Sequence, residues 1–147
     1  MRDIKKIIVH CSASKDVSAA TIKKWHTDPV DMQPVNGKMT NVGGRGWRDI
    51  GYHFVIRGSG NVEMGRTVAV QGAHVRGHNK DSIGICITGG KGGAMNYTEA
   101  QFQSLRVLIH GLREQHKIGK MAVFGHCDFT NAKTCPNFNV NAWYVGS

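Results

Sequence analysis

The chain has 147 residues, of which 40% are hydrophobic and 20% charged, and this composition is typical of one globular domain. No stretch is long and apolar enough to span a bilayer, so we expect no membrane insertion. Lysine and arginine outnumber aspartate and glutamate by 19 to 10, which gives a net charge of +9 with histidine neutral. This charge predicts attraction to polyanions, but it does not choose among nucleic acids, teichoic acids and other phosphate-bearing polymers.

The start of the chain and its cysteines bear on the compartment. Only three consecutive apolar residues precede His10, so the N-terminus contains no secretory signal and we expect synthesis in the cytoplasm. Four cysteines in a chain made there argue against a disulfide framework. They favour metal binding, reactivity or simple burial.

The first third of the chain predicts a strand, a helix and a long loop. An apolar run within residues 4–10 predicts a buried strand that ends at His10. Residues 18–27 have helical spacing and are closed by Pro29. Residues 28–46 are rich in proline, glycine and asparagine, which predicts a long loop.

The middle of the chain predicts β-structure. Residues 52–56 predict a strand, and the turn-forming residues 58–61 lead into a second strand over 62–66. We therefore expect a hairpin here. Residues 82–88 predict another buried strand, which stops at two glycines.

The last third predicts one well-defined helix and a final strand. Thr98 is placed to cap the helix, with Gln101 at the capping-box position. The apolar face of this helix consists of Phe102, Leu105, Leu108, Ile109 and Leu112. Residues 121–124 predict a short strand that leads to His126. Strands that alternate with helices but also form a hairpin predict an α/β fold, with a mixed central β-sheet flanked by α-helices in a single domain over residues 1–147.

Two histidines occupy matching positions at the ends of predicted strands. His10 ends the first strand and His126 follows the last one, and ligand sites in open α/β sheets gather at the carboxyl ends of strands. Cys135, nine positions after His126, offers a third ligand. Two imidazole nitrogens, one thiolate and an open position would make a catalytic zinc site. The alternative is chance, because the chain has eight histidines and this spacing is no standard zinc signature.

Four segments, in order along the chain, resemble the zinc-dependent N-acetylmuramoyl-L-alanine amidases. They are IVHCSAS at 8–14, GWRDIGYHF at 46–54, SIGI at 82–85 and KTCP at 133–136. The resemblance runs from about residue 7 to residue 144 and is to the small phage lysozymes of amidase type. That family shares its fold with the peptidoglycan recognition proteins.

The resemblance implies a site and a reaction. His10, His126 and Cys135 would hold one zinc ion, and Tyr52 and Lys133 would be the catalytic side chains. The implied reaction is hydrolysis of the amide bond between N-acetylmuramoyl and L-alanine in bacterial peptidoglycan, by an endolysin that lyses the host. Zinc would polarise the amide carbonyl and lower the pKa of a bound water to about 7. Lys133 would stabilise the oxyanion, and Tyr52 would orient the water or donate to the oxyanion.

The residues alone favour plainer roles for these two side chains. Tyr52 is expected on the same strand face as Phe54 and Ile56, which suits a core aromatic residue. Lys133 suits a solvated loop lysine. No carboxylate stands out as an obligatory base, and Glu63 is a weak candidate.

Two further residues, His74 and Asn79, resemble family positions that line the groove for the muramyl-peptide. Trp47 is expected to give this groove an apolar wall. A solvated loop is the alternative for the first two, and a place in the core is the alternative for Trp47. His26 is expected to be structural, and Cys86 is expected to be a small buried hydrophobic residue.

Two other functions compete with the enzyme. A peptidoglycan-binding module without activity would lack the cysteine ligand, so Cys135 favours an amidase. Some phage members of the family also bind and inhibit the phage RNA polymerase, but the segment before the first strand is shorter here, which counts against that partner. The loop at 28–44 is longer than its counterpart in the phage enzymes. We expect a monomer in the host cytoplasm that reaches the cell wall through a separate release mechanism.

Overall fold

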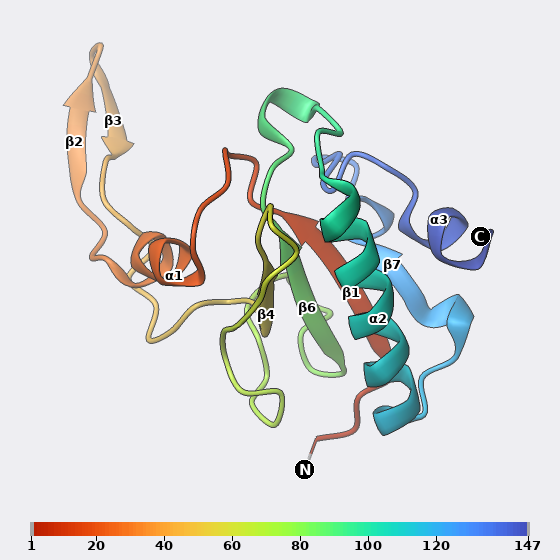
Figure 1. The fold of residues 1–147 in the computed structure, drawn as a ribbon. Coiled ribbons are helices and arrows are strands. Elements are labelled where there is room, and N and C mark those ends of the chain that lie inside the picture. The colour runs from red at the N-terminus through yellow and green to blue at the C-terminus, as the bar shows by residue number, and fades with distance from the viewer. Residues whose placement is uncertain (1, 147) are drawn as a thin grey trace.

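The computed structural model describes residues 2–146 and contains a five-stranded mixed β-sheet (Figure 1). In sheet order the strands are β5 (Val62–Met64), β4 (Phe54–Ile56), β6 (Ser82–Ile87), β1 (Lys6–Cys11) and β7 (Val123–Gly125). The central strand β1 is parallel to both of its neighbours, β6 and β7. β4 is parallel to β6 and antiparallel to β5, so the predicted hairpin forms the far edge of the sheet.

The two longer helices, α1 and α2, begin where the sequence predicts. The α-helices are α1 (Ala19–Thr27), α2 (Glu99–His116) and α3 (Val140–Val145), and short 3₁₀ turns occupy Lys91–Gly93, Lys120–Ala122 and His126–Asp128. Ser18 caps α1, and Thr98 and Gln101 form the predicted capping box of α2. The six-residue α3 was not predicted, because it is too short to show a helical period. Among the helices of residues 2–146, none combines the length and the apolar character needed to cross a membrane.

One face of the sheet carries the main core. Leu105 and Ile109 of α2 and Val140 of α3 are fully buried against the sheet, where they meet residues such as Val9 and Ile85. Figure 1 shows α2 running across this face. Burial of each such side chain contributes about 1.5–3 kcal/mol, so the predicted apolar face of α2 accounts for its position.

The other face carries a smaller core, and it contains Tyr52. Ile22 of α1 packs there with Val55 and Cys86, and Tyr52 lies against this cluster. The prediction that Tyr52 shares a face with Phe54 is therefore wrong: Phe54 belongs to the main core. The backbone bends just before β4, so regular alternation starts only at Phe54. Cys86 is fully buried, as predicted.

The predicted loop over 28–46 is wrong in its middle, where the chain forms a second, two-stranded sheet. Its strands are β2 (Met32–Val35) and β3 (Lys38–Asn41), which are antiparallel and exposed along their whole length. Asn36 and Gly37 connect them with φ angles of 51° and 78°. Asn-Gly with two positive φ angles is the sequence signature of a tight hairpin turn. Figure 1 shows this hairpin projecting beyond α1, away from the main sheet.

The base of this hairpin is closed by the backbone. Gly44 N–H donates to the Pro29 carbonyl at 2.9 Å, and a Cβ at Gly44 would lie 2.7 Å from the Asp28 Cβ. Three residues further on, Trp47 N–H donates to the His26 carbonyl at 2.9 Å. The chain after the hairpin is thus fixed to α1 independently of the conformation of the hairpin.

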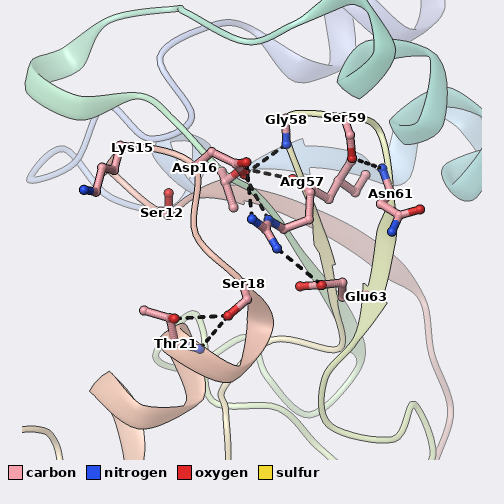
Figure 2. A network of polar contacts seen from close by, with 12 residues as sticks. Ser12, Lys15, Asp16, Ser18, Thr21, Arg57, Gly58, Ser59, Asn61 and Glu63 are labelled. Carbon is pink, nitrogen blue, oxygen red and sulfur yellow. Dashed lines mark hydrogen bonds and ion pairs between the residues drawn. The ribbon is translucent and has the colours of Figure 1, made fainter.

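A polar network ties the segment between β1 and α1 to the β4–β5 hairpin (Figure 2). The Asp16 carboxylate accepts hydrogen bonds from Arg57 Nε at 3.0 Å, Gly58 N–H at 3.0 Å and Thr88 Oγ1 at 2.7 Å. These contacts, with Arg57 first, lower the pKa of Asp16 to about 2. They hold in place the segment that follows the carboxyl end of β1.

Glu63 extends the same network, as Figure 2 shows. Its carboxylate lies 3.4 Å from Arg57 Nη1 and accepts a hydrogen bond from Ala19 N–H at 2.7 Å. The Glu63 carboxylate thus pairs with an N–H of the first turn of α1 that has no partner within the helix, and its negative charge interacts favourably with the helix dipole. Glu63 therefore has a structural role that accounts for its charge.

Asp16→Asn is expected to lower the melting temperature at pH 7 by a few degrees. The pKa of Asp16 lies below its unfolded value, so the stability it contributes is present above about pH 4 and is lost as the pH falls toward 2. The variant should therefore also show a shallower loss of stability between about pH 5 and pH 2. Thermal unfolding followed by circular dichroism measures both effects. Asp3→Asn is the control, because that side chain is 82% exposed; equal effects of the two changes would contradict a special role for Asp16.

Candidate functional site

His10, His126 and Cys135 meet at the carboxyl edge of the sheet. His10 lies near the end of β1 and is 1% exposed, while His126 begins the 3₁₀ turn that follows β7. The parallel pairing of β1 with β7 places both histidines at one edge, with ring centroids 4.7 Å apart. One donor atom from each of the three residues lies within 4.8 Å of the others. The structure thus brings together the three predicted ligands.

Cys135 reaches this point from a loop that the backbone holds in place. Cys127 N–H donates to the Cys135 carbonyl at 2.8 Å, which folds the loop back onto the 3₁₀ turn. The N–H of Cys11, the last residue of β1, donates to Cys135 Sγ at 2.9 Å. This backbone donor favours the thiolate, which is the form that binds metals. The Cys11 thiol and burial act the other way and raise the pKa of Cys135, so metal binding would displace its proton.

The two histidines are held in their neutral form. Burial lowers the pKa of His10 well below its usual value, and the nearby rings of His74 and His126 lower it further. Burial also lowers the pKa of His126, and Lys133 adds to that shift. Neutral imidazole has a free nitrogen lone pair, so both rings are ready to act as ligands at neutral pH.

The donor set fits zinc. Two imidazole nitrogens and one thiolate are ligands that zinc prefers, whereas calcium and magnesium take oxygen ligands. Zinc bonds of about 2.0–2.3 Å place neighbouring ligand atoms about 3.5 Å apart. Donor atoms that already lie within 4.8 Å of one another need only a small contraction to reach that spacing. Three protein ligands would leave the fourth position open.

A cavity of about 600 Å³ opens over this group. It is lined by His10, Cys11, Ser12, Ala13, His26, Arg45, Trp47, Tyr52, Ala73, His74, Val75, Arg76, Asn79, His126, Lys133 and Cys135. Its volume suits a small organic ligand or a segment of a polymer. All eight site residues predicted from the sequence line it.

Tyr52 and Lys133 both line the cavity with the three ligands, but Lys133 is exposed whereas Tyr52 is largely shielded from solvent. The Tyr52 ring lies 5.0 Å from the His10 ring, and burial raises the pKa of its phenol well above 10. The phenol therefore stays protonated and can donate a hydrogen bond. Lys133 is exposed and carries its charge close enough to lower the pKa of His126. The arrangement places one neutral donor and one cation at the open side of the group.

The N-acetylmuramoyl-L-alanine amidase family matches residues 1–138. The chain belongs to that family. It is 37% identical over 150 residues to the endolysin of Klebsiella phage KP32, covering 97% of this chain and 87% of that protein. It is also 37% identical over 145 residues to the endolysin of Escherichia phage T7, covering 94% and 83%. The resemblance inferred from the four motifs is confirmed.

Solved structures of amidase-family proteins share the fold. The N-acetylmuramoyl-L-alanine amidase LysC from Clostridium intestinale superposes with a TM-score of 0.74 at 24% identity, covering 99% of this chain and 87% of that one. The peptidoglycan recognition protein ectodomain complex with tracheal cytotoxin gives 0.74 at 22% identity, covering 97% and 81%. The predicted mixed sheet flanked by helices is thereby confirmed.

In this amidase-family chain, Trp47 and Asn79 frame the cavity. The Arg45 guanidinium lies 5.0 Å from the Trp47 ring, and the two side chains form one wall. The Asn79 amide oxygen accepts the N–H groups of His74 and Val75 at 2.9 and 2.8 Å, so it shapes the loop that forms another wall. Contact of Trp47, His74 and Asn79 with substrate stays a prediction.

Arg45 and Arg76 line the cavity and were missed in the sequence. With Lys133 they surround it with positive charge, and none of the described residues that line it is acidic. The available signal was their position: Arg45 directly precedes the Gly-Trp of one motif, and Arg76 comes two residues after His74. Composition hid them, because nineteen basic residues are spread along the chain.

His26 also lines the cavity but acts on the backbone, as predicted for a structural residue. Its Nδ1 accepts the Gly51 N–H at 2.9 Å, and its ring lies 4.9 Å from Trp47 and 5.5 Å from Tyr52. Burial lowers the pKa of His26 to about 4, so it stays a neutral acceptor. His26 thereby holds the bend that turns Tyr52 into the cavity.

Proposed function

We propose that this chain is a zinc-dependent N-acetylmuramoyl-L-alanine amidase that cleaves the amide bond between N-acetylmuramoyl and L-alanine in peptidoglycan, as a phage endolysin does. The observation that carries the proposal is the convergence of His10, His126 and Cys135 at the floor of a cavity. The identity to phage endolysins supports the biological setting. The cysteine favours the enzyme over a binding module without activity.

The three ligands would hold one zinc ion with a position open toward the cavity. The chemistry that a bound zinc ion supplies is Lewis acidity toward the scissile carbonyl and a water whose pKa falls to about 7. The Cys11 N–H donates to Cys135 Sγ and offsets part of the rise in the pKa of this thiol that the Cys11 thiol and burial cause, and zinc binding would displace the remaining proton. Burial lowers the pKa of His10, so a proton would not compete with the metal for its ring nitrogen at neutral pH.

Tyr52 and Lys133 would act on the carbonyl oxygen of the scissile amide. As the amide carbon becomes tetrahedral, negative charge develops on that oxygen. Lys133 would stabilise the charge as a cation, and the protonated phenol of Tyr52 would donate a hydrogen bond. Tyr52 is half-buried against the small core, and this packing would orient its hydroxyl before the reaction; donors that are oriented in advance stabilise the oxyanion most.

The remaining expectations complete the proposal. Residues 1–147 would act as one amidase domain and as a monomer, made in the host cytoplasm and released to the wall by a separate mechanism. The positive charge around the cavity suits the free carboxylates of peptide stems. Binding to phage RNA polymerase stays a prediction.

Cys135→Ser is expected to lose zinc and activity together, because a neutral hydroxyl replaces a thiolate ligand. Elemental analysis of the purified protein should give one zinc per chain for the parent and far less for the variant. Cys86→Ser is a matched control, since that thiol is buried in the small core rather than at the site. Full zinc occupancy in Cys135→Ser would remove this residue from the metal site.

The reaction product separates an amidase from a glycosidase. Digested peptidoglycan should gain free amino groups of alanine and no new reducing sugar ends. New reducing ends in place of amino groups would refute the proposed reaction even if zinc is bound.

Lys133→Ala and Tyr52→Phe are each expected to lower kcat by about 10²-fold or more, because each removes a partner of the developing oxyanion. Both variants should keep their zinc, since neither residue belongs to the ligand group. Turnover of a soluble muramyl-peptide measures the effect. Lys91→Ala, a change at an exposed lysine of a 3₁₀ turn, is the control. Parent-like turnover in both variants would show that these roles do not belong to this chain.

Arg45→Gln and Arg76→Gln are each expected to raise KM for a muramyl-peptide by about two- to five-fold, as suits the loss of one exposed ionic contact. Their kcat should change little, because neither guanidinium lies among the proposed reacting groups. Lys120→Gln makes the same change of charge away from the cavity. An equal rise in KM for Lys120→Gln would mean that charge acts on the substrate at long range instead.

A further inference from the structure

A chain of hydrogen bonds leads from the loop before β6 to the ligand His10. Ser82 Oγ lies 2.7 Å from the His78 carbonyl oxygen and 3.2 Å from His74 Nε2. On the other side of the same ring, His74 Nδ1 lies 2.8 Å from His10 Nε2. Three side chains and one carbonyl thus form one continuous path that ends on a metal ligand.

The direction of every bond in this path follows from its first member. A carbonyl oxygen only accepts, so the Ser82 hydroxyl must donate its single hydrogen to His78. Ser82 Oγ can then only accept from His74, which places the ring hydrogen of His74 on Nε2 and leaves Nδ1 as an acceptor. His10 must therefore donate from Nε2, and its Nδ1 carries the free lone pair.

The ring of His74 sits in a slot that two glycines keep open. A Cβ at Gly84 would lie 2.7 Å from the His74 ring, and a Cβ at Gly72 would lie 2.8 Å from it. Both distances are too short for any side chain. From the other direction, Asn79 holds the backbone N–H of His74 at 2.9 Å. Ring and backbone are therefore both fixed relative to β6.

The neighbouring His53 shows that burial alone does not create such a path. Its ring centroid lies 6.0 Å from that of His74, and its side chain is fully buried, whereas that of His74 is half-buried. Its Nδ1 accepts Gly84 N–H at 3.0 Å, and its Nε2 lies 2.8 Å from the Val70 carbonyl. Its Nε2 also lies 3.1 Å from Arg2 Nη2, and none of these three contacts reaches a metal ligand, so His53 supports the strand edge.

We propose that His74 is a positioning residue: locked by Ser82, it accepts a hydrogen bond from His10 Nε2 and thereby presents His10 Nδ1 to the metal. The inference rests on the proposed zinc site and adds which nitrogen binds and what selects it. A hydrogen bond to the far nitrogen of a ligand histidine fixes its ring orientation and raises its basicity. His74 thus acts on metal affinity, whether or not it also touches substrate.

The first test reads the ring nitrogens of the unmodified, zinc-loaded protein. Long-range proton–nitrogen spectra of histidine-labelled protein distinguish protonated, bare and metal-bound nitrogens. The expected pattern is hydrogen on Nε2 of both His10 and His74, a bare Nδ1 in His74, and a metal-bound Nδ1 in His10. A hydrogen on Nδ1 of His74, or metal on Nε2 of His10, would overturn the proposal.

The second test compares two substitutions that differ only in the acceptor. His74→Leu removes it, and zinc affinity measured by competition with a chelator should fall about 10- to 100-fold. His74→Asn puts an amide oxygen near the position of Nδ1 and should recover affinity to within a few-fold of the parent. Ile83→Val is the control for disturbed packing next to Ser82, because its buried side chain belongs to the main core on the other face of β6, and it should bind zinc like the parent.

The outcomes separate this proposal from the zinc site itself. A folded His74→Leu protein with parent affinity would overturn the positioning role while the zinc site stands. Equal losses in His74→Asn and His74→Leu would show a packing effect and would also overturn it. A parent protein that binds no zinc would refute the proposed function instead. If His74→Leu does not fold, the spectra of the unmodified protein still decide.

Discussion

The parallel pairing of β1 with β6 and β7 is the constraint on which the site depends. Parallel strands end at the same edge, so the residues that follow or close these strands meet without any long excursion of the chain. His10 and His126 become neighbours for this reason, and β6 supplies the glycine against which His74 lies. The hydrophobic cores on the two faces of the sheet keep the strands in register. Burial of these apolar side chains therefore also holds in place the nitrogen and sulfur atoms that would bind the metal.

Much of this arrangement could be predicted from local sequence. The apolar runs of β1 and β6 and the capping box of α2 are signals that lie within a few residues, and the structure confirms each one. The convergence of His10, His126 and Cys135 is a long-range property. It was accessible because strand ends gather at one edge and because four motifs in order resemble an amidase family.

What the sequence did not reveal depends on contacts between distant segments. Tyr52 faces the small core because His26, far away in the chain, accepts the Gly51 N–H and holds the bend before β4. The β2–β3 hairpin was hidden by a composition that also suits a loop, although its Asn-Gly turn was a readable signal. The role of His74 rests on the direction of hydrogen bonds, which no spacing in the sequence encodes.

The clasp at the base of the β2–β3 hairpin has a consequence for how the molecule can change. Backbone hydrogen bonds hold Gly44 and Trp47 next to the end of α1. The position of the chain after the hairpin is therefore set by α1 and does not depend on the length of the hairpin. The ten residues from Met32 to Asn41 therefore form a detachable appendage, and lengthening it costs little in loop-closure entropy. Evolution can remodel this appendage freely, and a protein engineer can graft a foreign peptide onto its tip, while the wall of the cavity stays where it is.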